Sequence, residues 1–151
     1  MELLSKFKFN DILSFDFNYT YTQTYDGAEY DNPNNSNKAG SQMVRVPRNI
    51  INLITNFKVP GYNGLDITLR SKWSDEARDY GNGNANRNGS QSFADAELES
   101  YLVNDFSLSY KLPNSYKFYL DVINITDKKY ETAQDYSQMD RSFNFGVKKT
   151  Y

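Results

Sequence analysis

The chain has 151 residues and a net charge of −2 at neutral pH, and it contains neither cysteine nor histidine. These absences exclude disulfides, thiolate metal sites and the histidine that most often serves as a general base, so we expect no enzyme and no cofactor. The 17 basic residues are balanced by 19 acidic ones and form no basic cluster, so we expect no nucleic-acid partner.

Seven segments alternate apolar and polar side chains with the period of two that is typical of β-strands. In SFDFNYTYTQTY, the clearest example, Phe15, Phe17 and Tyr19 share one face, and Asp16 and Asn18 share the other. No helical spacing of apolar residues competes with this pattern. The alternation predicts an all-β fold, an antiparallel up-and-down meander of about seven strands. In chain order, the predicted strands are residues 2–9, 12–25, 46–59, 65–75, 100–112, 116–126 and 140–151.

The connections between these segments alternate between short and long. Residues 10–11, 60–64 and 113–115 read ND, PGYNG and PNS, which are typical of tight turns. The long connections cover residues 26–44, 75–99 and 127–139. In a meander the three long connections lie at one end, an asymmetry typical of outer-membrane barrels with short periplasmic turns and longer extracellular loops. We therefore expect the end of the sheet with the long connections to contact other molecules, and the end with the short turns only to connect the strands.

Aromatic residues make up 16% of the chain and dominate the apolar parity, whereas the core of a soluble sandwich favours Val, Ile and Leu. They gather near the strand ends, as in the two aromatic girdles of a membrane barrel. Those toward the long connections are Tyr21, Tyr25, Trp73 and Tyr101, and those toward the short turns are Tyr62, Tyr110, Tyr116 and Tyr151. The polar parity, which suits a wet lumen, carries Asp16, Asp66, Arg70, Asp105, Lys111 and Asp121.

No apolar run approaches the ~20 residues of a membrane helix. A search for such runs does not detect the strands of a membrane barrel, because one side of each strand is polar. Three interpretations therefore stay open from the residues alone. The chain is part of a transmembrane barrel, or a small outer-membrane barrel of another class, or a soluble β-rich binding module. Heat-modifiable migration of the chain alone would favour the second, and a sharp monomeric thermal transition in plain buffer the third.

The last third of the chain resembles the C-terminal barrel part of TonB-dependent outer-membrane receptors. Residues 124–130 read NITDKKY, similar to the family's N-L-F-D-K-x-Y element, with Thr126 in place of its aromatic residue. The ending RSFNFGVKKTY is similar to the family's last strand, although it ends in Tyr151 instead of the usual Phe and carries Lys149 on the outward parity. Upstream, NYTYTQTYDG followed by RVPRNIINL also resembles the family, so the resemblance covers most of the chain.

The resemblance implies part of a receptor that imports a scarce nutrient, such as siderophore-iron or cobalamin, across the outer membrane of a Gram-negative bacterium. Such receptors have a barrel of 22 strands, an N-terminal plug and a segment that contacts TonB. We find about seven strands, no plug, no coupling segment and no signal peptide, so we expect residues 1–151 to be the C-terminal segment of the barrel. The expected partners are the lipid bilayer, the rest of the barrel and plug, the TonB complex and the barrel-assembly machinery.

Site residues follow from the same resemblance. Ligand contacts are expected from the long connections and the nearby lumen, where the candidates are Tyr30, Arg78, Tyr80, Arg87, Tyr136 and Arg141. Each of these residues could also be an ordinary surface residue. Arg141 could instead be a residue at the start of a strand that forms a pair within the lumen. The residues expected to face lipid and to be read by the assembly machinery are Phe143, Phe145, Val147 and Tyr151.

Two acidic groups in the second long connection raise the question of calcium. They comprise Asp75, Glu76 and Asp79, and then Asp95, Glu97 and Glu99. Their spacing is not that of an EF-hand loop, and runs of charge are usually solvated, so we predict no metal site. The sheet itself is expected to be curved and open, because seven strands leave two edges that lipid does not tolerate.

Overall fold

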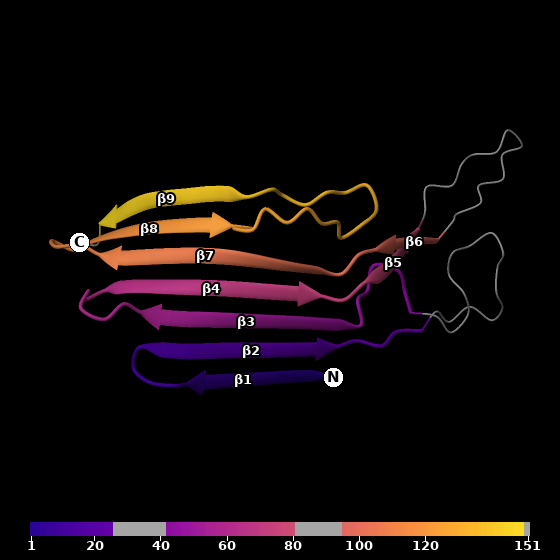
Figure 1. Ribbon diagram of the computed structural model, residues 1–151, viewed down its shortest axis with the longest axis horizontal. Coiled ribbons are helices and arrows are strands. Elements are labelled where there is room, and N and C mark those ends of the chain that lie inside the picture. Colours follow the sequence, from indigo (N-terminus) through magenta and orange to yellow (C-terminus); the bar gives the residue numbers. More distant parts are fainter. Residues whose placement is uncertain (26–41, 81–94, 150–151) are drawn as a thin grey trace, which may run out of the picture.

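The described part of the chain consists of β-strands joined by turns and loops (Figure 1). The computed structural model describes residues 1–25, 42–80 and 95–149. No helix in these ranges is long and apolar enough to cross a membrane. The strands are β1 (Glu2–Lys8), β2 (Leu13–Tyr21), β3 (Asn49–Lys58), β4 (Leu65–Ser74), β5 (Ala77–Tyr80), β6 (Asp95–Leu98), β7 (Tyr101–Lys111), β8 (Tyr116–Ile123) and β9 (Ser142–Lys149).

The long strands form one seven-stranded antiparallel sheet in the order β1-β2-β3-β4-β7-β8-β9. Apart from the step from β4 to β7, neighbours in the sheet are also neighbours in the sequence, which confirms the predicted meander. Strands β5 and β6 form a separate hairpin beyond the ends of β4 and β7 (Figure 1). The prediction of a loop is wrong for these two strands, because each has only four residues: ARDY does not alternate, and the alternation in DAEL is too short to be recognised as a strand.

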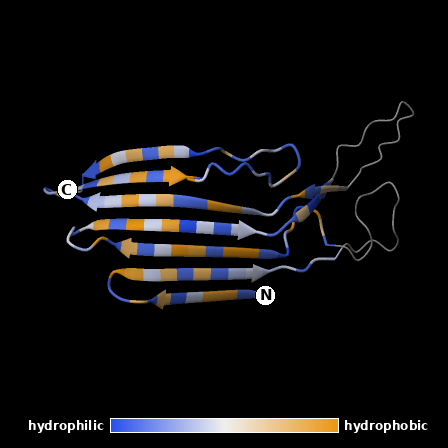
Figure 2. Ribbon diagram, in the orientation of Figure 1, coloured by the Kyte–Doolittle hydropathy of each residue, from blue (hydrophilic) through white to orange (hydrophobic). Residues whose placement is uncertain are grey.

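The register of the strands gives the sheet two faces of different character (Figure 2). Ile67 lies opposite Phe57, whereas the next residue, Thr68, lies opposite Asn56, because neighbouring side chains point to opposite sides of a strand. The face here called the apolar face carries Phe15, Phe17, Leu53, Phe57, Ile67, Leu69, Phe106, Leu108, Leu120, Phe143, Phe145 and Val147. The opposite side, here called the polar face, carries Asp16, Asn18, Asn52, Asp66, Arg70, Asp105, Lys111, Asp121 and Asn144.

The apolar face has no second protein layer over it in the described part of the chain. On β9, Phe143, Phe145 and Val147 are 61%, 76% and 60% exposed. Among the described residues, the buried apolar side chains are Leu98, Tyr101, Val103 and Val122, and they do not form a layer along the apolar face. A soluble sandwich would bury this face against a second sheet. The exposed aromatic surface therefore requires an apolar environment outside the sheet.

The tight turns at one end of the sheet have local causes. The side chain of Asn10 accepts hydrogen bonds from the backbone N–H groups of Ile12 and Leu13, both at 2.8 Å, and thereby closes the β1–β2 turn. In the β3–β4 turn, Gly64 has a φ of 84°, and a Cβ there would lie 2.7 Å from the Cβ of Lys111. Only glycine combines that angle with that contact, so the turn depends on it.

Three details at the strand ends differ from the predictions. Strand β2 ends at Tyr21, because the N–H of Thr24 donates to the side chain of Gln42 (3.0 Å) instead of to a neighbouring strand. Strand β8 ends at Ile123, because the next residue, Asn124, has a φ of 51°. Tyr101 belongs to the polar face, where it pairs with Ser74, so its expected place in an outward aromatic girdle is wrong.

Candidate ligand-contact site at the loop end of the sheet

The described parts of the long connections, which run over residues 22–48, 75–100 and 124–141, lie at one end of the sheet, here called the loop end. The tight turns lie at the opposite end, here called the turn end (Figure 1). Tyr30 and Arg87 fall outside the described residues. The described parts of the three connections contact one another through side chains far apart in the sequence. These contacts define the candidate site.

The centre of the loop end is the carboxylate of Asp79 on β5, whose side chain is fully buried. The Nε of Arg45 donates to Oδ1 at 2.7 Å, and the backbone N–H of Gln134 donates to Oδ2 at 2.6 Å. We call Arg45, Asp79 and Gln134 the Asp79 cluster. Because a buried carboxylate must be paired and hydrogen-bonded to be tolerated, this cluster holds one residue from each of the three connections together.

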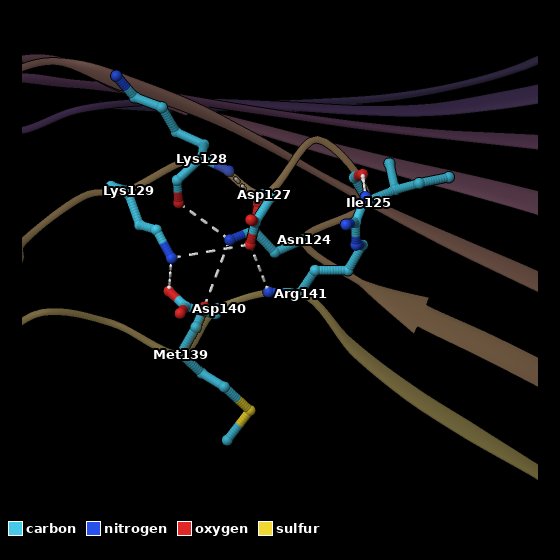
Figure 3. Close-up of polar contacts among 8 residues, drawn as sticks. All are labelled: Asn124, Ile125, Asp127, Lys128, Lys129, Met139, Asp140 and Arg141. Carbon is cyan, nitrogen blue, oxygen red and sulfur yellow. Dashed lines mark hydrogen bonds and ion pairs between the residues drawn. The ribbon is translucent and has the colours of Figure 1, made fainter.

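The third connection is organised by a second buried polar side chain, Asn124, which is 1% exposed (Figure 3). Its Nδ2 donates to the carbonyl oxygens of Lys128 (3.0 Å) and Met139 (3.3 Å), and its Oδ1 accepts the N–H of Lys128 (2.9 Å). We call residues 124–128 the Asn124 turn. It ties the beginning of the third connection to its end, so the connection starts and finishes at a fixed separation.

Charged residues reinforce this closure (Figure 3). The backbone N–H of Arg141 donates to Oδ1 of Asp127 at 2.9 Å, and this hydrogen bond lowers the pKa of the Asp127 carboxyl below its ordinary value. Lys129 forms an ion pair with Asp140, and that contact raises the pKa of the Lys129 ammonium. Lys129, Asp140 and Arg141 are exposed and Asp127 is half-buried, so each pair alone contributes little to stability.

An aromatic pair joins the third connection to the sheet. The rings of Tyr101 on β7 and Tyr130 lie with their centroids 4.3 Å apart and their planes at 33°. Burial in this contact raises the pKa of the Tyr130 hydroxyl. Tyr130 follows directly after the Asn124 turn and Lys129, so the stacking places the rest of the connection over the end of β7.

The predicted ligand residues are not brought together as one group. Arg78 adjoins Asp79, and its carbonyl oxygen accepts the N–H of Arg45 at 2.7 Å. Tyr80 ends β5 opposite Asp95, and its side chain lies outside the description. Tyr136 is 69% exposed, two residues beyond Gln134.

Arg141 lies elsewhere. Its guanidinium sits 6.0 Å from the ring centroid of Phe143 and donates to the carbonyl of Ile125 at 3.4 Å, so it lies on the side of the apolar face. Of the residues expected to face lipid, Phe143, Phe145 and Val147 share the apolar face, and Tyr151 falls outside the described residues.

An open cleft of about 640 Å³ lies beside Arg78 and is lined in part by Arg48, Asp75 and Glu97. Asp75 accepts a hydrogen bond from the amide of Asn49 at 2.7 Å, so it is not grouped with Asp79. Within the described residues, no three acidic side chains are placed to hold a metal ion. The cleft therefore offers cations and anions side by side, which suits a polar ligand rather than a metal.

The sequence did not predict three features of the site, namely Arg45, Gln134 and the structural role of Asn124. Arg45 and Asp79 are 34 positions apart, and Asp79 and Gln134 are 55 apart, so no local pattern links them. The available signal was the NITDKKY element, which marks the place of Asn124 without indicating its hydrogen bonds.

Comparison with known proteins identifies the family. The model of the family described as "TonB dependent receptor-like, beta-barrel" matches residues 1–125. The chain belongs to this receptor family. The family indicated by the sequence resemblance is thereby confirmed, and it is a family of receptors, not of enzymes. Its members lie in the outer membrane of Gram-negative bacteria, which is also the location of this chain.

Solved receptors share the fold of nearly the whole chain. The siderophore receptor PiuA from Acinetobacter baumannii is 23% identical with a TM-score of 0.68, and the match covers 97% of this chain and 20% of that one. The pyoverdine receptor FpvA from Pseudomonas aeruginosa is 17% identical, with a TM-score of 0.75 and coverages of 99% and 21%.

The ferric-catecholate import receptor Fiu from Escherichia coli is 16% identical, with a TM-score of 0.71 and coverages of 97% and 20%. No curated protein sequence matches the chain. The chain thus spans about a fifth of the length of the receptors whose structures it matches.

Proposed function

We propose that the chain forms one side of the barrel of a receptor that imports ferric siderophores across the outer membrane. The observation that carries this proposal is the family match over residues 1–125. The solved receptors that share the fold support a siderophore rather than cobalamin, because they are described as a siderophore receptor, a pyoverdine receptor and a ferric-catecholate import receptor. The proposal includes that the TonB complex supplies the energy for import by the whole receptor.

In this proposal the apolar face contacts lipid and the polar face lines the lumen. On β4, the apolar-face positions run from Leu65 to Trp73, which corresponds to about 27 Å along the strand. These positions span nine residues, within the roughly 9–11 that a tilted strand needs to cross a membrane. Trp73 at the loop end and Tyr110 at the turn end suit the two aromatic girdles. Phe143, Phe145, Val147 and Tyr151 are proposed to face lipid and to be read by the assembly machinery.

The remaining partners follow from the two edges of the sheet. Within the described chain, β1 and β9 each pair on one side only. Lipid does not satisfy free backbone groups, so both edges require further strands. We propose that the rest of the barrel supplies them, that a plug lies against the polar face, and that residues 1–151 are the C-terminal segment.

The ligand is proposed to contact the loop end. Arginine and tyrosine donate hydrogen bonds to the anionic oxygens that hold iron in catecholate and hydroxamate siderophores. Arg78 and Tyr136 are close in sequence to the Asp79 cluster, which supports their role. Tyr80, Tyr30, Arg87 and Arg141 remain proposed ligand residues on the sequence argument alone.

The test is uptake of iron by cells that do or do not make the protein carrying this chain. Radioactive ferric pyoverdine and a ferric catecholate serve as probes, and cobalamin as the competing ligand. We expect saturable binding of one ferric probe, with import lost in cells without TonB. Import of cobalamin alone, or recovery of the protein in the soluble fraction without detergent, would contradict the proposal.

A further inference from the structure

The Asp79 cluster joins all three long connections through a single carboxylate. We propose that Asp79 is a positioning residue that holds the loop-end connections as one unit and so sets the shape of the ligand-contact surface. The second half of this statement rests on the proposed function. The first half, the coupling of the three connections, rests only on the described contacts.

The geometry of the carboxylate explains why it can act in this way. Its two oxygens receive donors from different connections, Oδ1 from Arg45 and Oδ2 from the backbone of Gln134, while Asp79 itself belongs to the second connection. Because the two oxygens are fixed in one plane, the two donors are fixed relative to each other. An asparagine at this position has one acceptor oxygen and one NH₂ group, so it can satisfy only one of the donors.

The two neighbours of the carboxylate differ in their other contacts. The N–H of Arg45 donates to the carbonyl of Arg78 at 2.7 Å, so Arg45 is bound to the second connection by both backbone and side chain. Gln134 carries a buried Oε1 that finds no hydrogen-bond partner among the described residues. Burial of this oxygen opposes the packing of the third connection, so the hydrogen bond to Asp79 carries more of its stability.

The coupling has a consequence for the proposed ligand residues. Arg78 lies next to Asp79 in the sequence, and Tyr136 lies two residues after Gln134. The separation between these two side chains therefore depends on the bond between Asp79 and Gln134. Loss of that bond is expected to let the second and third connections move independently and to misalign the two contacts.

Hydrogen exchange on the complete receptor in outer-membrane vesicles tests the coupling. We expect Asp79→Asn to raise exchange at least tenfold in residues 42–48, 77–80 and 131–137 together. Glu76→Gln, which removes an exposed charge three residues away, is the matched control and should leave exchange unchanged. A rise confined to residues 77–80, or an equal rise in the control, would overturn the proposal.

A double substitution makes the test independent of one variant. Arg45→Gln should loosen the same three segments, whereas Arg48→Gln should not. Arg45→Gln combined with Asp79→Asn should loosen them no more than Asp79→Asn alone, because both substitutions remove one shared contact. If Asp79→Asn does not reach the outer membrane, the comparison of Arg45→Gln with Arg48→Gln decides. If the double variant raised hydrogen exchange by the product of the two single effects, the coupling would be overturned.

Binding of ferric pyoverdine and a ferric catecholate separates this inference from the proposed function. We expect Asp79→Asn to weaken binding of the recognised probe at least tenfold, Asp79→Glu to recover part of it, and Asp11→Asn, an exposed residue at the turn end, to leave it unchanged. If the unaltered receptor binds neither probe, the proposed function fails while hydrogen exchange still decides the coupling. If the connections loosen and affinity stays the same, the positioning role of Asp79 is overturned.

Discussion

The aromatic ring of Tyr119 on β8 lies directly against the backbone of Gly146 on β9. The two residues are paired in the sheet, and a Cβ added to Gly146 would come within 2.6 Å of the Tyr119 ring carbon that bears the hydroxyl, and closer still to the hydroxyl oxygen. An aromatic side chain that covers a glycine of the neighbouring strand fixes the register of the pair. The last strand of the chain is thus aligned by a contact on the polar face.

We predict that Gly146→Ala hinders the docking of β9. The added methyl group collides with the Tyr119 ring, and overpacking of this kind costs about 1–3 kcal/mol. The measurement is the fraction of receptor that migrates as a folded, heat-modifiable species. Gly146→Ala combined with Tyr119→Ala is the control, because removal of the ring makes room for the methyl group. Equal loss in the single and double variants would show that the ring is not the obstacle.

The second prediction concerns the buried amide of Asn124. Asn124→Ala leaves the N–H of Lys128 and two carbonyl groups without their partner, at about 1–3 kcal/mol for each group that stays buried. We expect faster hydrogen exchange at Lys128 and a lower urea midpoint. Asn144→Ala on the exposed part of the polar face should change neither. Asn124→Gly keeps the backbone angle accessible and isolates the contribution of the amide.

The third prediction is a dependence on pH. The folded pKa of Asp127 lies below its ordinary value of 3.8, so its hydrogen bond from Arg141 stabilises the third connection at pH above that value. The stabilisation is lost as the pH falls from about 3.8 through the lowered pKa. We expect the difference in thermal stability between the native receptor and Asp127→Asn to be constant from pH 8 to 5 and to vanish in acid. A difference that does not shrink as the pH falls below 3.8 would contradict this assignment.

The fourth prediction tests which face contacts lipid. Leu69 lies midway along β4 on the apolar face, and Leu65 lies on the same face at the turn end. Leu69→Arg should lower the free energy of unfolding in lipid vesicles by about 2–4 kcal/mol, and Leu65→Arg by only ~0–1, because arginine near the interface reaches water. Thr68→Arg, on the polar face, is the control. Equal effects of Leu69→Arg and Thr68→Arg would contradict the assignment.

The seven long strands could be predicted because alternation is a local property of the sequence. Strands β5 and β6 could not, because each has only four residues, too few for a period of two to be recognised, and they pair only across a long connection. The position of Tyr101 on the polar face could have been predicted from the alternation, because Leu102 and Phe106 share the apolar parity and Tyr101 has the opposite parity. Its burial against Tyr130 depends on a contact that the sequence does not reveal.

The candidate site could be predicted only in outline. Arginine and tyrosine residues in the long connections were identifiable, and the NITDKKY element marked the position of Asn124. The pairing of Arg45 with Asp79 requires two separate connections to meet at one end of the sheet. Contacts between separate connections depend on loop closure and packing, and these produce no periodic pattern in the sequence.

The division between turn end and loop end has an evolutionary consequence. Register is set outside the long connections: at the turn end Asn10 closes one hairpin and Gly64 another against Lys111, and within the sheet the ring of Tyr119 on β8 covers Gly146 on β9. Insertions and deletions in the long connections therefore leave the pairing of the strands untouched. Under the proposed function, a lineage can exchange the segments that contact the ligand and keep its membrane wall, provided that a residue such as Asp79 gathers the new segments. Change of specificity is then confined to the loop end, while the paired strands preserve the scaffold.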